Sequence, residues 1–189
     1  MSRYAIRLLL GALLLALTLA TVVRAQPDKP SEYQIKAAFL YNFAKFTDWG
    51  SGNPTIAASQ EGGFVLCVAG KDPFGSALAA IEGKLVQGQR LRIRLGVSPE
   101  TVSGCHMLFV SESEERRAPV FLKAAQQHPV LTVSDIEGFT DAGGMIGLVV
   151  ADSRIQFDIN LAPANRVNLK VSSQLLSLAR SVSGGKGRN

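Results

Sequence analysis

Phe64-Val-Leu-Cys-Val-Ala69 is a run of six apolar residues, and together with the Gly70-Lys-Asp-Pro73 that follows, it decides the fold class. An apolar run of strand length without polar alternation is typical of a strand buried on both faces. Asp72 can cap a helix that has Pro73 at its first position. The stretch therefore predicts a strand, a turn and a helix in succession.

Similar short runs follow toward the C-terminus, with helical segments between them. We expect helices at residues 74–81 and 120–127, and strands at residues 91–97, 106–110 and 130–134. Short apolar strands that alternate with helices indicate an α/β fold with a mostly parallel central sheet flanked by helices.

The last third of the chain has a different pattern. Residues 145–150 and 154–161 are strand-like, and the short link between them cannot make a parallel crossover, so an antiparallel hairpin is expected. Beyond it, Ser172 can cap a terminal helix whose apolar residues extend to Val182. Residues 183–189 are predicted to be a disordered tail.

A long first helix is predicted ahead of the sheet. Ser31 and Gln34 have the spacing of a capping box, and apolar residues then recur at helical intervals as far as about Thr47. Trp49 follows at the end of this helix, and residues 50–63 have the composition of a surface loop.

Residues 1–25 are predicted to be a signal peptide. Two arginines precede an apolar stretch over residues 8–23, and Val23-Arg-Ala25 is a small-x-small cleavage site. We expect export to the periplasm and cleavage after Ala25, which leaves residues 26–182 as a single α/β domain. The alternative is an uncleaved membrane anchor, for which the apolar run is a little short.

The charge distribution shows no nucleic-acid-binding footprint. Of the 20 Lys and Arg residues, Arg3, Arg7 and Arg24 leave with the signal peptide, and the remainder nearly balance the 15 Asp and Glu residues. The remaining charges are scattered along the chain. Nothing in the composition demands an anionic partner.

Cys67 and Cys105 are the two cysteines, and an even number in an oxidising compartment favours one intramolecular disulfide. In the chain-entropy description, closing this loop stabilises the folded state by about 4 kcal/mol before a discount for strain. Two buried, unpaired thiols are the alternative. A metal site is disfavoured, because two distant histidines, His106 and His128, lack the close paired spacing of zinc ligands.

No catalytic or cofactor-binding constellation is recognisable in the sequence. Residues 70–75 connect a strand to a helix but match neither the P-loop nor the dinucleotide fingerprint. His106 and His128 have no nearby partners in the order of a known triad, and we interpret them as structural or surface residues. The sequence therefore favours binding over catalysis.

Three segments taken together resemble the YfiR-like periplasmic family. They are YQIKAAFLYNFAKFTDW (residues 33–49), LTVSDIEGFTDAGGMI (131–146), and the pair FDINL and LKVSSQLLSLA (157–161 and 169–179). The resemblance spans nearly the whole mature chain, and both cysteines fall where the family commonly has a pair.

The resemblance implies a compact α/β domain without known catalytic activity, often a homodimer. The best understood members bind the sensor domain of an inner-membrane diguanylate cyclase and repress it, which lowers cyclic-di-GMP and biofilm growth. An outer-membrane lipoprotein can sequester such repressors. The prototype has a second cysteine pair late in the domain, and this chain lacks it, so redox control through that pair is excluded.

A periplasmic small-ligand sensor is the alternative function. The carboxyl ends of parallel strands in an α/β sheet commonly form a ligand crevice. An enzyme ranks third, and a histidine beside a carboxylate in a cleft would favour it.

For a protein partner, we expect contacts after the first helix and on the exposed face of the late hairpin. The expected partner-binding residues are Trp49, Arg154, Asp158, Asn160 and Lys170. An aromatic ring with a polar rim is a typical contact patch. Two of these residues have structural alternatives, because Trp49 can cover the sheet edge and Asn160 can hydrogen-bond the following turn.

Overall fold

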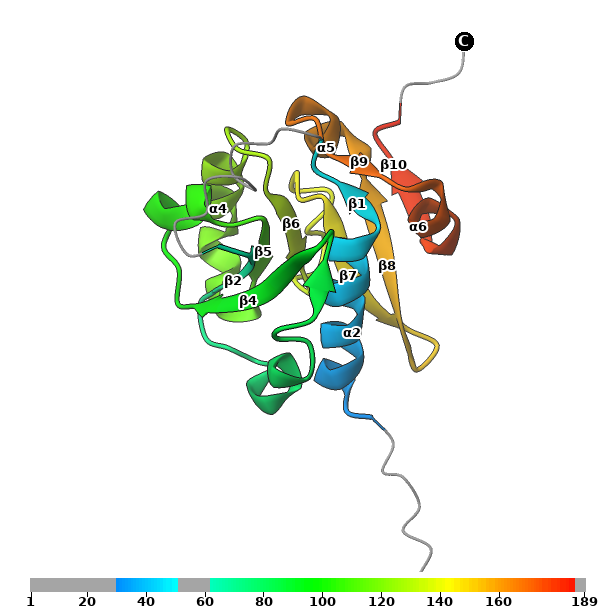
Figure 1. Ribbon diagram of the computed structural model, residues 1–189. Coiled ribbons are helices and arrows are strands. Elements are labelled where there is room, and N and C mark those ends of the chain that lie inside the picture. Colours follow the sequence, from blue (N-terminus) through cyan, green and yellow to red (C-terminus); the bar gives the residue numbers. More distant parts are fainter. Residues whose placement is uncertain (1–29, 51–61, 186–189) are drawn as a thin grey trace, which may run out of the picture. The chain divides into compact units, whose positions relative to one another are not determined.

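A mostly parallel sheet forms the centre of the computed structural model, which describes residues 30–50 and 62–185 (Figure 1). Among these residues the sheet has eight strands in the order β10-β8-β7-β6-β5-β2-β4-β3. The strands are β2 (Phe64–Ala69), β3 (Leu85–Val86), β4 (Gln89–Leu95), β5 (Met107–Val110), β6 (Leu131–Ser134), β7 (Ile146–Ala151), β8 (Arg154–Asn160) and β10 (Ser181–Ser183). Adjacent strands from β4 to β7 are parallel, whereas β3 and β8 pair antiparallel with β4 and β7. The predicted α/β fold with a C-terminal antiparallel hairpin is confirmed.

The strand β2 lies inside the sheet and is buried along its whole length. Because side chains alternate along a strand, Leu66 belongs to the apolar core on one face and Cys67 to the core on the other. The neighbouring strands β4 and β5 pair with its two edges. A strand enclosed on all sides has no polar face, which explains its unbroken apolar sequence.

The first helix, α2 (Glu32–Lys45), covers one face of the sheet. Ser31 and Gln34 form the predicted capping box at its start. Phe43 is buried, and its ring packs against Phe157 of β8 with the ring centroids 5.0 Å apart. The aromatic stripe of this helix is therefore core packing.

The helix ends at Lys45 rather than near Thr47, because a short strand follows it. This strand, β1 (Thr47–Asp48), pairs antiparallel with β9 (Lys170–Val171) in a two-stranded sheet of its own. Partners so distant in the sequence leave no local periodicity that could reveal the pairing.

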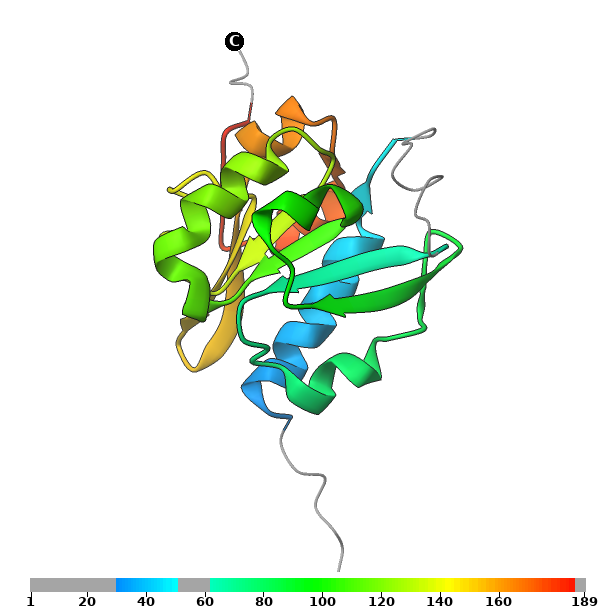
Figure 2. The same ribbon diagram turned by 90° about the vertical axis from the view of Figure 1, so that its left-hand side faces the viewer.

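The opposite face of the sheet is covered by α4 (Ala118–Ala125) and the 3₁₀ helix η2 (Pro99–Gly104). Figure 2 shows α4 in front of the strands and α2 behind them. The predicted helix at residues 74–81 is instead a 3₁₀ helix, η1 (Gly75–Ala80), and another, η3 (Glu112–Arg117), leads into α4. Such tight helices are common as short connections.

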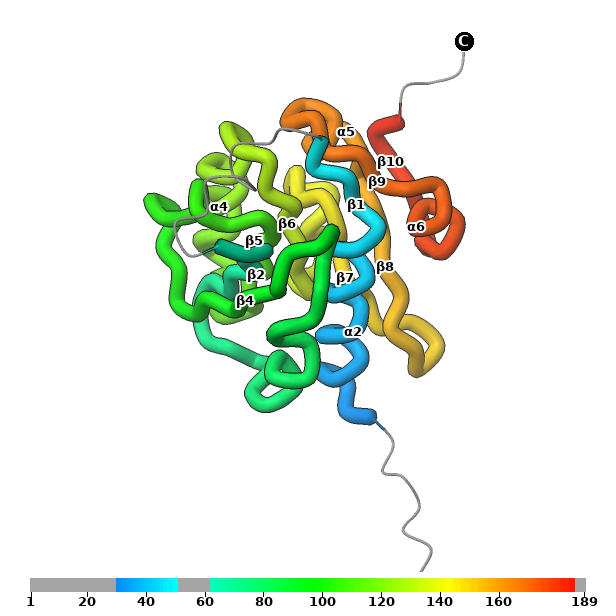
Figure 3. Tube along the Cα trace, viewed as in Figure 1, coloured from blue at the N-terminus to red at the C-terminus, as the bar shows by residue number. Residues whose placement is uncertain are grey.

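The C-terminal region contains α5 (Leu161–Arg166) and α6 (Ser173–Leu178), and Ser172 caps α6 as predicted. The helix α6 does not reach Val182. The backbone N–H of Arg180 donates to β8 at 2.8 Å, and β10 then pairs in parallel with β8 (Figure 3). The predicted tail therefore begins too early, since Ser183 belongs to β10.

A disulfide joins Cys67 of β2 to Cys105, just before β5, with Cα atoms 5.9 Å apart. Both residues are fully buried on the α4 side of the sheet. The predicted pairing is confirmed, and the alternative of two free thiols is excluded.

The described residues from Ser31 onward form one compact unit by their contacts. Residues 1–25, the predicted signal peptide, and residues 186–189 lie outside the described residues. The signal peptide and a disordered tail at residues 186–189 therefore stay predictions.

Candidate functional site

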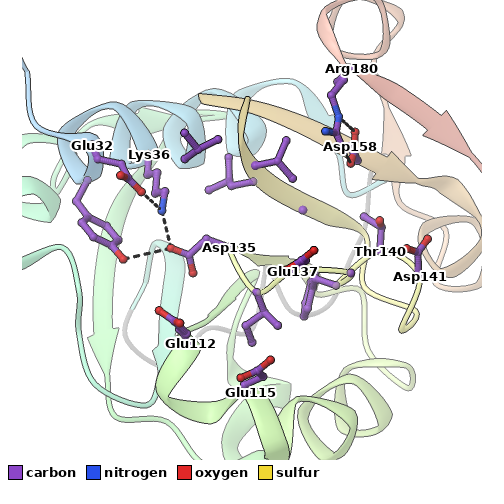
Figure 4. A pocket seen from close by; sticks show the side chains of 18 residues that line it. Glu32, Lys36, Glu112, Glu115, Asp135, Glu137, Thr140, Asp141, Asp158 and Arg180 are labelled. Carbon is purple, nitrogen blue, oxygen red and sulfur yellow. Dashed lines mark hydrogen bonds and ion pairs between the residues drawn. The ribbon is translucent and has the colours of Figure 1, made fainter. Parts of the chain in front are cut away.

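A cavity of about 810 Å³ lies at the carboxyl ends of β5 and β6 and extends over one face of β7 and β8 (Figure 4). The chain enters η3 directly after β5 and a loop directly after β6, and both segments line the cavity. We call it the acidic cavity because seven carboxylates and two cations line it: Glu32, Glu112, Glu115, Asp135, Glu137, Asp141 and Asp158, with Lys36 and Arg180. A crevice at strand carboxyl ends is the usual ligand site of a parallel α/β sheet.

Lys36 links α2 to the end of β6 inside the acidic cavity. Its Nζ lies 2.7 Å from Asp135 Oδ2 and 2.5 Å from Glu32 Oε1, although the residue is only 4% exposed. Burial has the largest effect and lowers the pKa of Lys36, but the hydrogen bonds to Asp135 and Glu32 outweigh it and raise the pKa above its ordinary value. Lys36 is therefore a buried, fully charged ammonium group.

Tyr33 completes this cluster. Its hydroxyl donates to Asp135 Oδ2 at 3.3 Å, and Lys36 Nζ lies 4.5 Å from the centroid of its ring. Burial, followed by the negative charge of Asp135, raises the pKa of Tyr33, so the phenol keeps its proton. Both donors therefore meet at the same carboxylate oxygen.

The other oxygen, Asp135 Oδ1, has no hydrogen-bond partner among the described residues. The Asp135 side chain is only 9% exposed, and Figure 4 shows it between Lys36 and Glu112 at the wall of the acidic cavity. A buried carboxylate oxygen without a donor is unfavourable, because its lost hydration is not replaced.

Asp158 and Arg180 form the other end of the acidic cavity. Arg180 Nε donates to Asp158 Oδ1 at 2.9 Å and Nη2 donates to Oδ2, so the pair is bidentate. The Ser181 hydroxyl also donates to Oδ1, at 2.8 Å. The Arg180 hydrogen bonds are the main cause that lowers the pKa of Asp158.

A loop between β6 and β7 borders the acidic cavity and is held by its own contacts. The backbone N–H of Gly144 donates to the carbonyl of Phe139 at 2.9 Å, and the Phe139 ring is buried. A Cβ at Gly144 would collide with that ring. Glycine is therefore required here for close packing, in addition to the turn that Gly143 makes at φ +98°.

Two predicted partner-binding residues have structural roles instead. Trp49 is 3% exposed, its ring packs edge-on against Phe64, and its Nε1 donates to the carbonyl of His106 at 3.3 Å. Asn160 caps α5 by accepting from Ala162 N, and its Nδ2 donates to Thr140 O, both at 3.0 Å. Trp49 is therefore part of the interior, and the half-buried Asn160 uses both ends of its amide group for contacts within the chain.

The other three predicted residues do not form one patch. Arg154 is exposed at the hairpin end of the seven-residue strand β8, about 20 Å along the strand from its far end. Lys170 is exposed on β9. Asp158 lines the acidic cavity.

The two histidines differ in their surroundings. His106 is fully buried, its Nδ1 accepts from Val65 N at 2.9 Å, and its ring stacks on Phe64. His128 lines a shallow cleft of about 380 Å³ that Ser103 and Glu100 also border. No hydrogen bond links these three side chains in the described part of the chain, so the arrangement lacks the connected geometry of a nucleophile and its base.

Sequence reasoning missed Lys36, Asp135 and Arg180. Asp135 carried a usable signal, because it directly follows a buried strand and so lies at a strand carboxyl end. Lys36 gave none, since a lysine in a helix normally faces solvent.

Comparison with known proteins gives one family and weak structural likenesses. The YfiR/HmsC-like family matches residues 33–180. A conserved domain protein from Vibrio cholerae O1 biovar El Tor strain N16961 is similar over 81% of this chain and 60% of its own, with 12% identity and a TM-score of 0.47. The ABC domain from Streptococcus pneumonia in complex with L-Trp is similar over 69% of this chain and 60% of its own, with 10% identity and a TM-score of 0.46. This chain thus spans about 60% of each structure, and neither likeness supports an inference about function.

Proposed function

Because the chain belongs to the YfiR/HmsC-like family, we propose that it is a non-catalytic regulator that binds the periplasmic sensor domain of an inner-membrane diguanylate cyclase and lowers cyclic-di-GMP. The family match over residues 33–180 is the observation that carries this proposal. The family is periplasmic, and its members are known as non-catalytic regulators.

Export supports the proposal from the sequence side. The predicted signal peptide, cleaved after Ala25, would place the mature chain beside the sensor domain. Within residues 30–50 and 62–185, no helix combines the length and apolar character that crossing a membrane requires.

The regulator acts through differential affinity. A bound protein shifts the cyclase toward its inactive state only if it binds the sensor domain more tightly in that state. We propose that partner contacts are made at separate places on the surface, by the exposed Arg154 and Lys170 and by Asp158, which lines the acidic cavity. Sequestration by an outer-membrane lipoprotein and a homodimeric state belong to the same proposal.

Deleting the gene tests the proposed function. Cellular cyclic-di-GMP should rise several-fold, and expression of the intact chain should restore it. A copy that lacks residues 1–25 stays in the cytoplasm and should fail to complement. An unchanged cyclic-di-GMP level after deletion, in a strain with an active cyclase of this type, would contradict the proposal.

A periplasmic small-ligand sensor is the second candidate, and the acidic cavity favours it. Its volume of about 810 Å³ suits a small molecule, and it lies where parallel α/β sheets bind ligands. A thermal-shift screen of amino acids, nucleotides and cell-wall fragments would separate the two functions, because a pure protein-binding regulator should show no shift.

A further inference from the structure

The acidic cavity carries more negative charge than the described residues neutralise. Lys36 is paired with Glu32 and Asp135, and Arg180 is paired with Asp158. Four further carboxylates that line the cavity form no salt bridge with a described residue: Glu112, Glu115, Glu137 and Asp141. The electrostatic potential inside the cavity is therefore negative, which favours the entry of cations.

Asp135 is a second, independent indication of a ligand. Its Oδ2 receives both Lys36 and Tyr33, while its Oδ1 has no donor among the described residues and is itself buried, in a side chain that lines the cavity and is nine-tenths buried. A ligand that donates a hydrogen bond to Oδ1 would replace the hydration that burial removes. This hydrogen bond would therefore contribute more to binding than one to an exposed carboxylate.

We propose that the acidic cavity binds an organic cation, whose ammonium or guanidinium group donates to Asp135 Oδ1 while Glu112 and Glu137 provide the surrounding negative charge. A metal ion fits less well, because the described residues contain no group of three His, Cys, Asp or Glu that could hold one. Carboxylates spread over a cavity of this size suit an elongated cation with several N–H donors. This inference depends on the cavity alone and not on the proposed cyclase.

The cationic group can belong to a free small molecule or to a Lys or Arg side chain of a partner protein. Three probes distinguish these sources in isothermal titration calorimetry with the purified mature chain. They are spermidine, L-argininamide, and a blocked Gly/Ser hexapeptide with one central arginine. The same peptide with citrulline in place of arginine keeps the shape and removes the charge, and succinate serves as the anionic control.

Two sets of substitutions test the residues. Asp135→Asn keeps the size of the side chain and should weaken cation binding at least about tenfold, since a charge-assisted hydrogen bond is lost. The double variant Glu112→Gln/Glu137→Gln changes two exposed side chains, so it should fold normally and weaken binding about threefold to tenfold. Glu82→Gln, exposed and outside the cavity, is the matched control and should bind as the unchanged chain does.

Binding of spermidine or L-argininamide with these losses supports a free ligand, and binding of the arginine peptide alone supports a partner side chain. If Asp135→Asn does not fold, the double variant decides. The proposal is overturned if no cationic probe binds at millimolar concentration, if the citrulline peptide binds as tightly as the arginine peptide, or if the double variant keeps full affinity.

Discussion

The centre of the sheet and its β7–β8 margin differ in how they are covered. Every residue of β2 and β5 is buried, because α2 packs on one face and α4 with η2 on the other. In the margin, Leu148 and Phe157 face α2, whereas Val149 and Asp158 on the other face border the acidic cavity. The centre is therefore covered on both faces, whereas the margin is covered on one face and carries charge on the other.

The largest expected difference comes from removing apolar volume in the two regions. Phe109 of β5 is fully buried with its ring 4.7 Å from that of Phe74, so Phe109→Ala should lower the free energy of unfolding by about 3–5 kcal/mol. Val150 of β7 is 61% exposed, and Val150→Ala should change it by less than about 0.5 kcal/mol. Urea denaturation measures both, and equal losses would contradict the comparison.

The disulfide holds the centre together, so its loss should have the next largest effect. Replacing both Cys67 and Cys105 with alanine should lower the free energy of unfolding by about 3 kcal/mol, chiefly because the unfolded chain regains freedom. A reductant should lower the Tm of the unchanged chain but not of the variant. If complete reduction leaves the Tm of the unchanged chain the same, the disulfide does not stabilise the fold.

Lys36 lies where the centre and the margin meet. Lys36→Met leaves Asp135 buried without its cation and should lower the free energy of unfolding by about 2 kcal/mol. This is less than the loss usual for a fully buried ion pair, because the second partner of Lys36, Glu32, has a half-exposed side chain. The raised pKa of Lys36 means that its contribution is complete below the unfolded value of about 10.4 and is lost only as pH rises through the folded pKa.

The difference between the unchanged chain and Lys36→Met should therefore stay constant from about pH 6 to about pH 9 in urea denaturation. Lys123→Met, at an exposed position of α4, is the control and should have little effect. A difference that disappears near neutral pH would show that Lys36 is not charged in the folded chain.

The smallest effect is expected in the margin itself. Asp158→Asn weakens the bidentate contact with the partly exposed Arg180 and should lower the Tm by about 1–3 °C at neutral pH. Because the folded pKa of Asp158 is lowered, its contribution is present above the unfolded value of about 3.9 and is lost as pH falls through the folded value.

Melting curves of the unchanged chain and Asp158→Asn should therefore converge in acid. A Tm difference that persists well below pH 3 would show that the Asp158 charge is not its cause. Glu137→Gln, which removes a charge from the same cavity without breaking a described salt bridge, provides the comparison.

Local patterns predicted most of the fold correctly. The unbroken apolar run of β2, the alternation in β8 and the caps at Ser31 and Ser172 each depend on neighbours in the sequence, and all are confirmed. The predicted end of α6 was wrong because it depends on a distant contact. The backbone N–H of Arg180 donates to β8, and the local sequence does not encode the position of that strand.

The candidate site was much less predictable. The contact of Lys36 with Asp135 joins positions 99 residues apart, and the position of a lysine in a helix does not reveal such a partner. Trp49 was predicted to be a partner contact, with covering the sheet edge as the alternative, and it is buried directly after β1, which pairs with the distant β9. Among the predicted partner residues, only Asp158 lines the acidic cavity. The alternation along residues 154–161 had placed it on the polar face of that strand, but it did not predict a cavity there.

The packing of Phe139 on Gly144 has a consequence for how the cavity can diversify. Any side chain at position 144 must first displace an aromatic ring that is anchored in the α4 core, so the rim cannot be reshaped by small local steps. Exposed rim positions such as Glu137 and Asp141 carry no such restriction. Related chains could therefore alter the charge of the cavity by exchanging rim residues while the outline of the opening stays the same.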